Sequence, residues 1–235
     1  MGVEMKEEHK KKVVMIGQED VEEGMLLNRL NPHFLYNTLE TIRMMARKND
    51  QTEIEEMIKM LGRVLRGSIE VRPGLVSLQS EMRMVESYLR IQQYRFGDRI
   101  RFEIHIECSL GGIFVLPLMI QPLVENAYRY GLEEKEGKDS LVSITVRKGD
   151  NLQIIIEDNG VGIEQEKFEL IKRGMEDFTT FNEAKINLSN IHQRIQMLYG
   201  EKYGITIHSA KMQGTKVEIL LPIIYNPTYL CGEQV

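Results

Sequence analysis

Residues 154–163 read "IIIEDNGVGI" and are the most informative segment for the architecture of this chain. The successive isoleucines predict a buried strand that ends near Asp158. Gly160 and Gly162 follow, and residues without a side chain let the backbone approach a flat ring closely. A carboxylate beside them can accept a hydrogen bond from an exocyclic amine. The same letters also suit an ordinary strand-end turn, so this stretch alone leaves both interpretations open.

The segments on either side of this strand predict a mixture of hairpins and helices. Residues 141–160 read as two strands joined by a turn at "KGDN". Residues 100–107 alternate between apolar and polar types, and residues 204–222 predict another pair of strands. Residues 117–131 and 187–200 predict helices that each end at glycine. Because hairpins dominate, we expect an α+β fold with a mainly antiparallel or mixed sheet and helices on one face.

The first part of the chain predicts helices. Apolar residues recur at helical spacing over residues 35–46 and, after a break at 48–53, over residues 54–65. "RPG" at 72–74 is a strong stop, and a second long stripe runs through residues 78–96. Apolar stripes on two long helices need a partner surface. We expect antiparallel pairing, doubled by a second chain into a dimeric four-helix bundle.

The break in this helical pattern lies in residues 30–40, "LNPHFLYNTLE". Either Asn31 caps a helix with Pro32 at its first position, or the helix runs through and kinks at Pro32. In the first arrangement the positive helix end keeps His33 a neutral nucleophile, and Asn37, one turn on, can orient the ring. The alternative is a capped helix start with a surface histidine, which is the commoner situation for this residue type.

A second candidate site lies in residues 122–131, "PLVENAYRYG". Glu125 and Asn126 offer the hard oxygen donors that suit Mg²⁺, an ion that takes few protein ligands. Arg129, followed by Tyr130 on the same helix, can meet a phosphate. The alternative interpretation is a helix with a polar outward face.

Near the end of the chain, residues 214–222 read "GTKVEILLP". Gly214 and Thr215 are placed to close a ring pocket beside Asp158. A plain β-turn followed by a strand explains the same letters.

The composition excludes several classes of protein. The 235 residues carry a formal net charge of −5, so nonspecific binding to nucleic acid is not favoured. The two cysteines, Cys108 and Cys231, lie far apart and fit a reducing compartment. The longest apolar run is too short to span a bilayer. We therefore expect a soluble chain without direct membrane insertion, whether or not it belongs to a longer membrane protein.

The order of the motifs is more specific than any one of them. "LNPHFLYNTLETI", "QPLVENAYRYG", "IIIEDNGVGI" and "GTKVEILLP" follow one another over residues 20–222. In this order they resemble the sensor histidine kinases of the YesM/LytS-like class. The resemblance covers nearly the whole chain, and "NPHFLYNTL" and "QPLVEN" are its specific signatures.

The resemblance implies a two-part kinase, with a helical dimerisation and phosphoacceptor domain at residues 1–99. Residues 100–235 then form an ATP-binding domain of the Bergerat type, an α/β sandwich shared with DNA gyrase. His33 matches the phosphoacceptor histidine. Asn126 matches the asparagine that holds Mg²⁺, and Asp158 matches the aspartate that recognises adenine.

Further positions follow from the same resemblance. Glu125 is a candidate for polarising the Mg²⁺ shell or the acceptor histidine, and Arg129 falls where relatives carry a basic or variable residue. Tyr130 stands where relatives often have histidine, although other histidine kinase classes have tyrosine there. Gly160 and Gly162 accompany the aspartate of the adenine pocket.

The chain departs from the family pattern just before its last predicted helix. Many relatives read "G-x-G-L-x-N" there, whereas this chain has "KINLSN", so Lys185 and Asn187 replace both glycines. Leu188 and Asn190 keep the remaining positions. The charge of Lys185 can compensate in part for a lost backbone cradle around the phosphates.

The expected activity is ATP-dependent autophosphorylation of His33, followed by transfer to an aspartate of a response regulator. Residues 164–185 are expected to form a mobile lid, and residues 97–98 the connection on which the catalytic domain swings. The expected partners are a second copy of the chain and a receiver domain, in the cytoplasm. Two alternatives stay open: a non-catalytic dimer that senses nucleotide or binds a partner, and an ATPase of the same superfamily that releases free phosphate.

Overall fold

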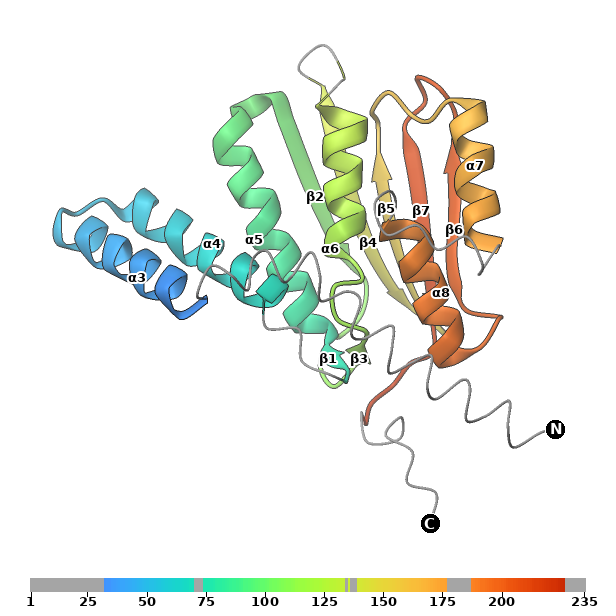
Figure 1. Ribbon diagram of the computed structural model, residues 1–235, viewed down its shortest axis with the longest axis horizontal. Helices are drawn as coiled ribbons and strands as arrows, with labels where there is room; N and C mark the ends of the chain where they lie inside the picture. The colour runs from blue at the N-terminus through green and yellow to red at the C-terminus, as the bar shows by residue number, and fades with distance from the viewer. Residues whose placement is uncertain (1–31, 70–73, 134, 136–138, 177–186, 227–235) are drawn as a thin grey trace. The chain divides into compact units, whose positions relative to one another are not determined.

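The computed structural model describes residues 32–69, 74–133, 135, 139–176 and 187–226 (Figure 1). The chain divides into two compact units, residues 1–71 and 72–235. None of the described helices is long and apolar enough to cross a membrane.

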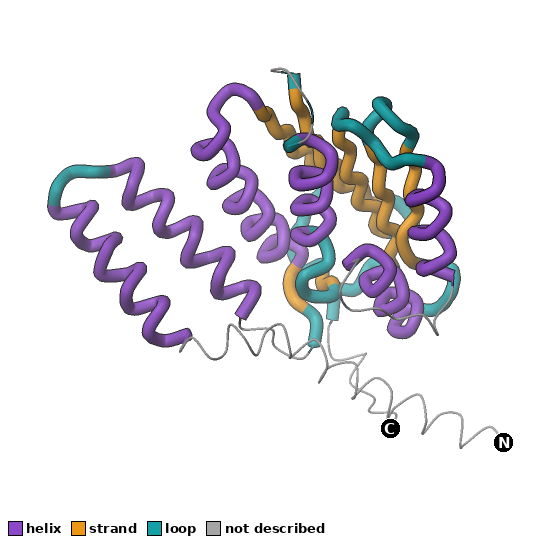
Figure 2. The backbone as a smooth tube through the Cα atoms, turned by 45° about the horizontal axis from the view of Figure 1, so that its top comes forward, coloured by secondary structure: helices purple, strands orange, loops and turns teal. Residues whose placement is uncertain are grey.

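The first unit contains a helical hairpin. Helix α3 (Pro32–Lys48) and helix α4 (Thr52–Ile69) are joined by a short turn and run antiparallel, side by side (Figure 2). Asp50 in the turn has a positive φ of 55°, a conformation that aspartate tolerates better than most residues. Ala46 and Met60 are buried in this unit. The predicted break at residues 48–53 is therefore the reversal of the hairpin.

The second unit is built on a five-stranded mixed sheet of order β2-β4-β5-β7-β6. Strands β2 and β4 are parallel, and the other neighbours are antiparallel. The strands have the bounds β2 (Ile100–Ile106), β4 (Ser140–Lys148), β5 (Leu152–Asp158), β6 (Gly204–Ser209) and β7 (Thr215–Leu221). The predicted mixed sheet and its two hairpins are confirmed.

Four α-helices lie on one face of this sheet (Figures 1 and 2). They are α5 (Leu78–Phe96), α6 (Gln121–Asn126), α7 (Gln165–Glu176) and α8 (Asn187–Tyr199). A π-helix, η2 (Ala127–Leu132), continues α6 directly, and a short 3₁₀ turn, η1 (Gly97–Arg99), joins α5 to β2. A two-residue pair, β1 (Val76–Ser77) with β3 (Phe114–Val115), stands apart from the main sheet.

The core lies between the sheet and these helices. Along β5, Leu152, Ile154 and Ile156 are almost fully buried, whereas Glu157, which points to the other face, is exposed. Ile155, on the same face as Glu157, is nevertheless buried at 6% exposed, so the period-two pattern of a sheet covered on one side holds for most of β5 and not for all of it. The α+β architecture predicted from the sequence is therefore confirmed.

Helix α5 packs differently from the sequence prediction. Its apolar stripe, Leu78, Met82, Val85 and Leu89, is buried in the core of the second unit. Helix α5 contacts α6 and β2 there. The antiparallel helical hairpin is instead formed by α3 and α4. The compact units accordingly divide between residues 71 and 72, whereas the domains were expected to divide between residues 99 and 100.

Two expectations about moving parts need correction. Residues 165–176 of the expected lid form α7, which buries Ile171 and Met175 against the core, while residues 177–186 lie outside the described part of the chain. The expected swing point at residues 97–98 is a tight turn within the second unit. It joins two elements that pack on each other, so it does not connect the two units.

Candidate functional site

Asp158 ends strand β5 and is the centre of the candidate nucleotide site. Its side chain is buried, and its Oδ1 accepts a hydrogen bond of 2.9 Å from the backbone N–H of Gly160. Burial raises the pKa of this carboxyl group to about 6, against the lowering effect of the N–H groups of Gly160 and Thr215. A buried carboxyl group needs hydrogen-bond donors for its oxygens, so Asp158 can accept a further hydrogen bond from a ligand.

Glycines pack so closely around Asp158 that no side chain fits in their place. A Cβ on Gly131 would lie 2.6 Å from Asp158 Oδ1, and a Cβ on Gly214 would lie 2.0 Å from the Asp158 carbonyl oxygen. A Cβ on Gly160 would meet the Gly131 carbonyl oxygen at 2.2 Å. Gly162 and Gly214 also have positive φ values of 66° and 78°. The predicted Asp158, Gly160, Gly162 and Gly214 are thus brought together.

Hydrogen bonds fix the loops that carry these glycines. The Ser209 hydroxyl donates to the Gly214 carbonyl oxygen at 2.9 Å and accepts from the Ile163 N–H at 3.0 Å. It also lies 2.9 Å from the Thr215 hydroxyl. Thr215 is the strand-pairing partner of Asp158. Ser209 therefore ties the turn after Asp158 to the turn before β7.

Asn126 and Glu125 lie at the end of α6, where the helix widens into the π-helix η2. Both are half-buried. The Gln121 side-chain amide donates to Glu125 Oε1 at 2.7 Å. Within the described ranges, no three histidine, cysteine, aspartate or glutamate side chains gather as a metal cluster.

The π-helix carries Arg129 and Tyr130 outward, and both are exposed. The Arg129 guanidinium lies 5.5 Å from the centre of the Tyr130 ring. Lys167 of α7 approaches the same ring, with its Nζ 5.4 Å from the centre. These distances are within the range of cation–π contacts. Two cations from different elements therefore lie beside one aromatic ring.

The segment before α8 is only partly described. Lys185 lies outside the described residues, and Asn187 is the first residue of α8. Asn190, in the first turn of α8, is half-buried. Helix α8 contacts α6, so Asn190 and Asn126 lie on neighbouring helices.

A hollow of about 400 Å³ lies beside Asp158. Gly214 and Thr215 line it together with Glu157 and Lys216. Its lining contains none of the described residues of α6 or η2. Of the predicted site residues, this hollow is therefore lined by Asp158, Gly214 and Thr215, which lie at the ends of β5 and β7.

In the first unit, His33 is exposed on the first turn of α3. The Asn37 side-chain amide lies 3.2 Å from Nδ1 and 3.3 Å from Nε2 of the ring. The expected contact between these two side chains is therefore present. The two arrangements considered for Pro32 differ at Asn31, which lies outside the described residues.

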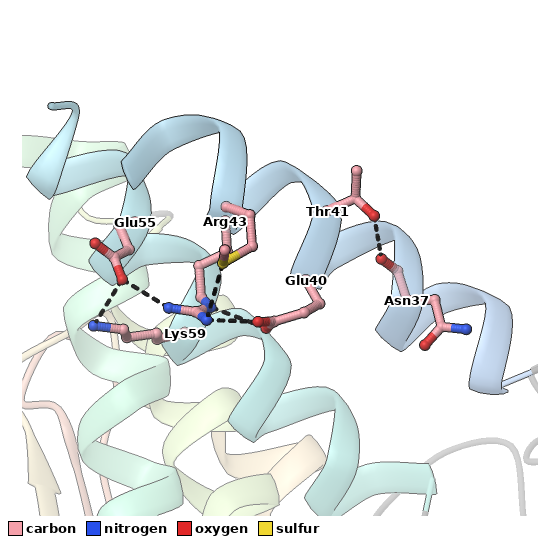
Figure 3. A network of polar contacts seen from close by, with 7 residues as sticks. Asn37, Glu40, Thr41, Arg43, Glu55 and Lys59 are labelled. Atoms are coloured by element: carbon pink, nitrogen blue, oxygen red, sulfur yellow. Dashed lines mark hydrogen bonds and ion pairs between the residues drawn. The ribbon is translucent and has the colours of Figure 1, made fainter. Parts of the chain in front are cut away.

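A polar network one turn further on joins α3 to α4 (Figure 3). The Arg43 guanidinium donates to Glu40 on its own helix, with Nε 2.9 Å from Oε2, and to Glu55 of α4 at 2.7 Å. Lys59 also approaches Glu55, at 3.2 Å. The pKa of the Glu40 carboxyl group is lowered by its hydrogen bonds to Arg43. Glu40 is thus engaged in the helix pairing.

Sequence reasoning missed several residues that build the candidate site. Gly131 was noted only as a helix end, yet it touches Asp158. Ser209 and Lys167 were not singled out. The signal for Gly131 was its place at the end of the asparagine-bearing helix, where a close approach to another element demands glycine. Contacts between residues so far apart in the chain leave no periodic pattern in the sequence.

Comparisons with known proteins agree with this arrangement. Residues 21–100 match the family described as "Histidine kinase", and residues 115–224 match the "Histidine kinase-, DNA gyrase B-, and HSP90-like ATPase" family. The two matches define a protein of the histidine kinase class with an ATPase-type region.

Curated relatives place the chain more narrowly. It is 34% identical to the sensor histidine kinase YesM of Bacillus subtilis, over 93% of this chain and 36% of that protein. It is 30% identical to the sensor protein LytS of Staphylococcus haemolyticus, over 87% of this chain and 34% of that protein. The chain belongs to the sensor histidine kinases of the YesM and LytS kind, and it spans about a third of the length of these relatives.

Among solved structures, the histidine kinase domain of a blue-light-activated histidine kinase from Erythrobacter litoralis is similar at 13% identity and a TM-score of 0.47. The match covers 86% of this chain and 99% of that domain.

Proposed function

We propose that this chain is the kinase part of a two-component sensor: it transfers the γ-phosphoryl group of ATP to His33 and then to an aspartate of a response regulator. The observation that carries the proposal is an exposed imidazole, contacted by Asn37 at the start of α3, in a chain with an ATPase-type region. A phosphoacceptor must be accessible, and the ring is.

The second unit offers a fitting adenine site. The buried Asp158 carboxylate can accept the exocyclic amine of adenine, and the glycines packed around it leave backbone rather than side chains at the mouth. Gly160, Gly162, Gly214 and Thr215 are proposed to shape this pocket. Adenine has the flat ring and the donor that such a site requires.

We assign the phosphate end of the nucleotide to α6, η2 and the segment before α8. Asn126 would hold Mg²⁺, with Glu125 beside it, and the ion would neutralise charge on the phosphates. Arg129 and Tyr130 are exposed near this end, where a guanidinium can pair with phosphate oxygens. Lys185 and Asn190 complete the proposed set.

The reaction needs little covalent help from the protein. The lone pair of the neutral His33 ring attacks the γ-phosphorus, an N–P bond forms, and the bond to the β–γ bridging oxygen breaks as ADP leaves. Positioning and charge stabilisation dominate such transfers. Asn37 supports the ring orientation through its amide contact. The phosphohistidine then donates its phosphoryl group to a carboxylate of the partner protein.

The hairpin is proposed to form a homodimer. Large apolar side chains stay exposed on both of its helices, among them Phe34 and Met45 on α3 and Ile54 on α4. A second copy of the same hairpin would cover them in a four-helix bundle. Exposed apolar surface of this kind marks an interaction site.

The deciding experiment is a product analysis after incubation with γ-labelled ATP and Mg²⁺. The proposal expects label on the protein, absent in His33→Gln. Steady release of free phosphate without labelled protein would indicate an ATPase instead. Nucleotide binding without either product would indicate a non-catalytic dimer, an alternative that the replacement of the lid glycines at residues 185 and 187 keeps relevant.

A further inference from the structure

Glu81 is a charged side chain buried in the second unit and placed far from Asp158 in the chain. It lies in the first turn of α5 and is only 3% exposed. Its carboxylate accepts hydrogen bonds from three successive backbone N–H groups, those of Leu118 at 3.1 Å, Met119 at 3.2 Å and Ile120 at 3.5 Å. None of the predicted site residues that the structure describes takes part in these hydrogen bonds.

The three residues that carry these N–H groups directly precede α6. Ile120 is the residue that precedes the helix, and its apolar side chain cannot cap it. Leu118 has a positive φ of 54°, which is costly for leucine. A negative charge is favourable at a helix N-terminus. Glu81 therefore fixes, from another helix, the turn that leads into α6 and places a carboxylate beside it.

The same two segments are joined at further points. Val76 and Ser77 pair with Val115 and Phe114 in the β1–β3 ladder, and the Leu78 N–H donates to the Ile113 carbonyl oxygen at 2.8 Å. Residues 76–81 and 113–120 are thus held to each other along their length. The first of these segments is also where the chain enters the second unit.

Burying a carboxylate is costly, but the N–H groups of residues 118–120 need an acceptor, which an apolar residue could not supply. The cost raises the pKa of Glu81, despite the lowering effect of its three backbone partners. Helix α6 begins one residue after Ile120 and ends at Asn126. Because the helix is so short, a shift of its first residue also shifts the positions of Glu125 and Asn126.

We propose that Glu81 is a positioning residue for the Mg²⁺–phosphate end of the nucleotide site: its carboxylate holds the start of α6 and thereby sets the place of Asn126. This inference rests on the proposed function. Asp158 is held on β5 by the Gly160 N–H and by its pairing with Thr215, and it meets this helical segment at Gly131, ten residues after the start of α6. Glu81 therefore acts mainly on the Mg²⁺-dependent part of binding, and less on the adenine contact.

The test uses Glu81→Gln, which keeps the shape but replaces one acceptor oxygen by a donor. Glu86→Gln is the matched control, because Glu86 lies on the same helix and forms a surface ion pair with Arg90. Calorimetry measures ADP affinity with Mg²⁺ and with EDTA. The expected result is a loss of about tenfold in the Mg²⁺-dependent gain, since one bond to a charged group is removed, with affinity in EDTA within about twofold of wild type.

A general loss of stability would weaken binding under both conditions, so equal losses overturn the inference. A second measurement needs no variant. Because coupling is reciprocal, Mg·ADP should slow hydrogen exchange of the Leu118, Met119 and Ile120 amides in the wild-type chain, by more than ADP in EDTA does. Equal protection in both conditions contradicts the proposal.

The two levels of the account can fail separately. A wild-type chain that binds no nucleotide contradicts the proposed function and this inference together. Normal wild-type binding, with an unchanged Mg²⁺-dependent gain in Glu81→Gln, overturns the role of Glu81 alone.

Discussion

Replacing Asp158 by asparagine should stabilise the nucleotide-free protein near neutral pH while removing its nucleotide affinity. Burial raises the pKa of this carboxyl group from its usual value of 3.8 to about 6. An acid whose folded-state pKa is raised binds more protons in the folded than in the unfolded state. Its contribution to stability is therefore complete below pH 3.8 and is lost as the pH rises through about 6.

The magnitude follows from these two values. A rise from 3.8 to about 6 corresponds to an unfavourable contribution of ~3 kcal/mol to folding at pH 8. Asparagine removes that charge and can still accept the Gly160 N–H bond. It loses the acceptor facing the Thr215 N–H, at a cost of about 1 kcal/mol. The net gain at pH 8 is ~2 kcal/mol, or about 4–8 °C in Tm for a chain of this size.

Thermal unfolding of wild type and Asp158→Asn from pH 4 to pH 8, without nucleotide, measures this effect. The difference in Tm should shrink as the pH falls through about 6. Asp150→Asn is the control, because it removes one carboxyl group from the exposed β4–β5 turn. A variant that is less stable than wild type at pH 8, or a gain that does not change with pH, would refute the reasoning.

Two more substitutions test the packing of each unit. Gly160→Ala puts a Cβ 2.2 Å from the Gly131 carbonyl oxygen, so it should lower the stability of the protein by ~3 kcal/mol and abolish ATP binding in calorimetry. The control is Gly149→Ala, which has open space around it and should change neither stability nor ATP binding. A well-folded Gly160→Ala variant that binds ATP would disprove the close contact. Met45→Lys puts a charge on the exposed apolar face of α3 and should raise the dimer dissociation constant, measured by sedimentation, by at least about tenfold. Leu170→Lys, at an exposed position of α7, is the control and should leave that constant unchanged. Equal dissociation constants for the two variants would show that the dimer interface lies elsewhere.

Local patterns in the sequence predicted the strands well. The alternation along residues 141–160 and the turn at "KGDN" are short-range signals, and they located β4, β5 and Asp158 at the strand end. The glycines after Asp158 were identified for the same reason. In these segments the sequence pattern and the tertiary contacts point to the same structure.

The partners of amphipathic helices were harder to predict. The stripe on residues 78–96 shows that one face of α5 must be covered, but it does not show by what, and the covering surface is the second unit. Helix α7 was missed because its charged residues obscured the helical spacing of Phe168, Ile171 and Met175. The sequence indicated Glu81 only as part of a helix start, because its partners are backbone groups about forty residues away.

The central claim is that a nucleotide held by the second unit phosphorylates His33. The most direct measurement is the occupancy of phosphohistidine at residue 33, by mass spectrometry under alkaline conditions, after incubation with ATP and Mg²⁺. The account predicts an acid-labile, alkali-stable phosphoryl group on His33, and none on this chain when Asp158 is replaced by asparagine. An unmodified His33 in protein that has bound Mg·ATP, or a phosphoryl group on a different residue, would contradict it.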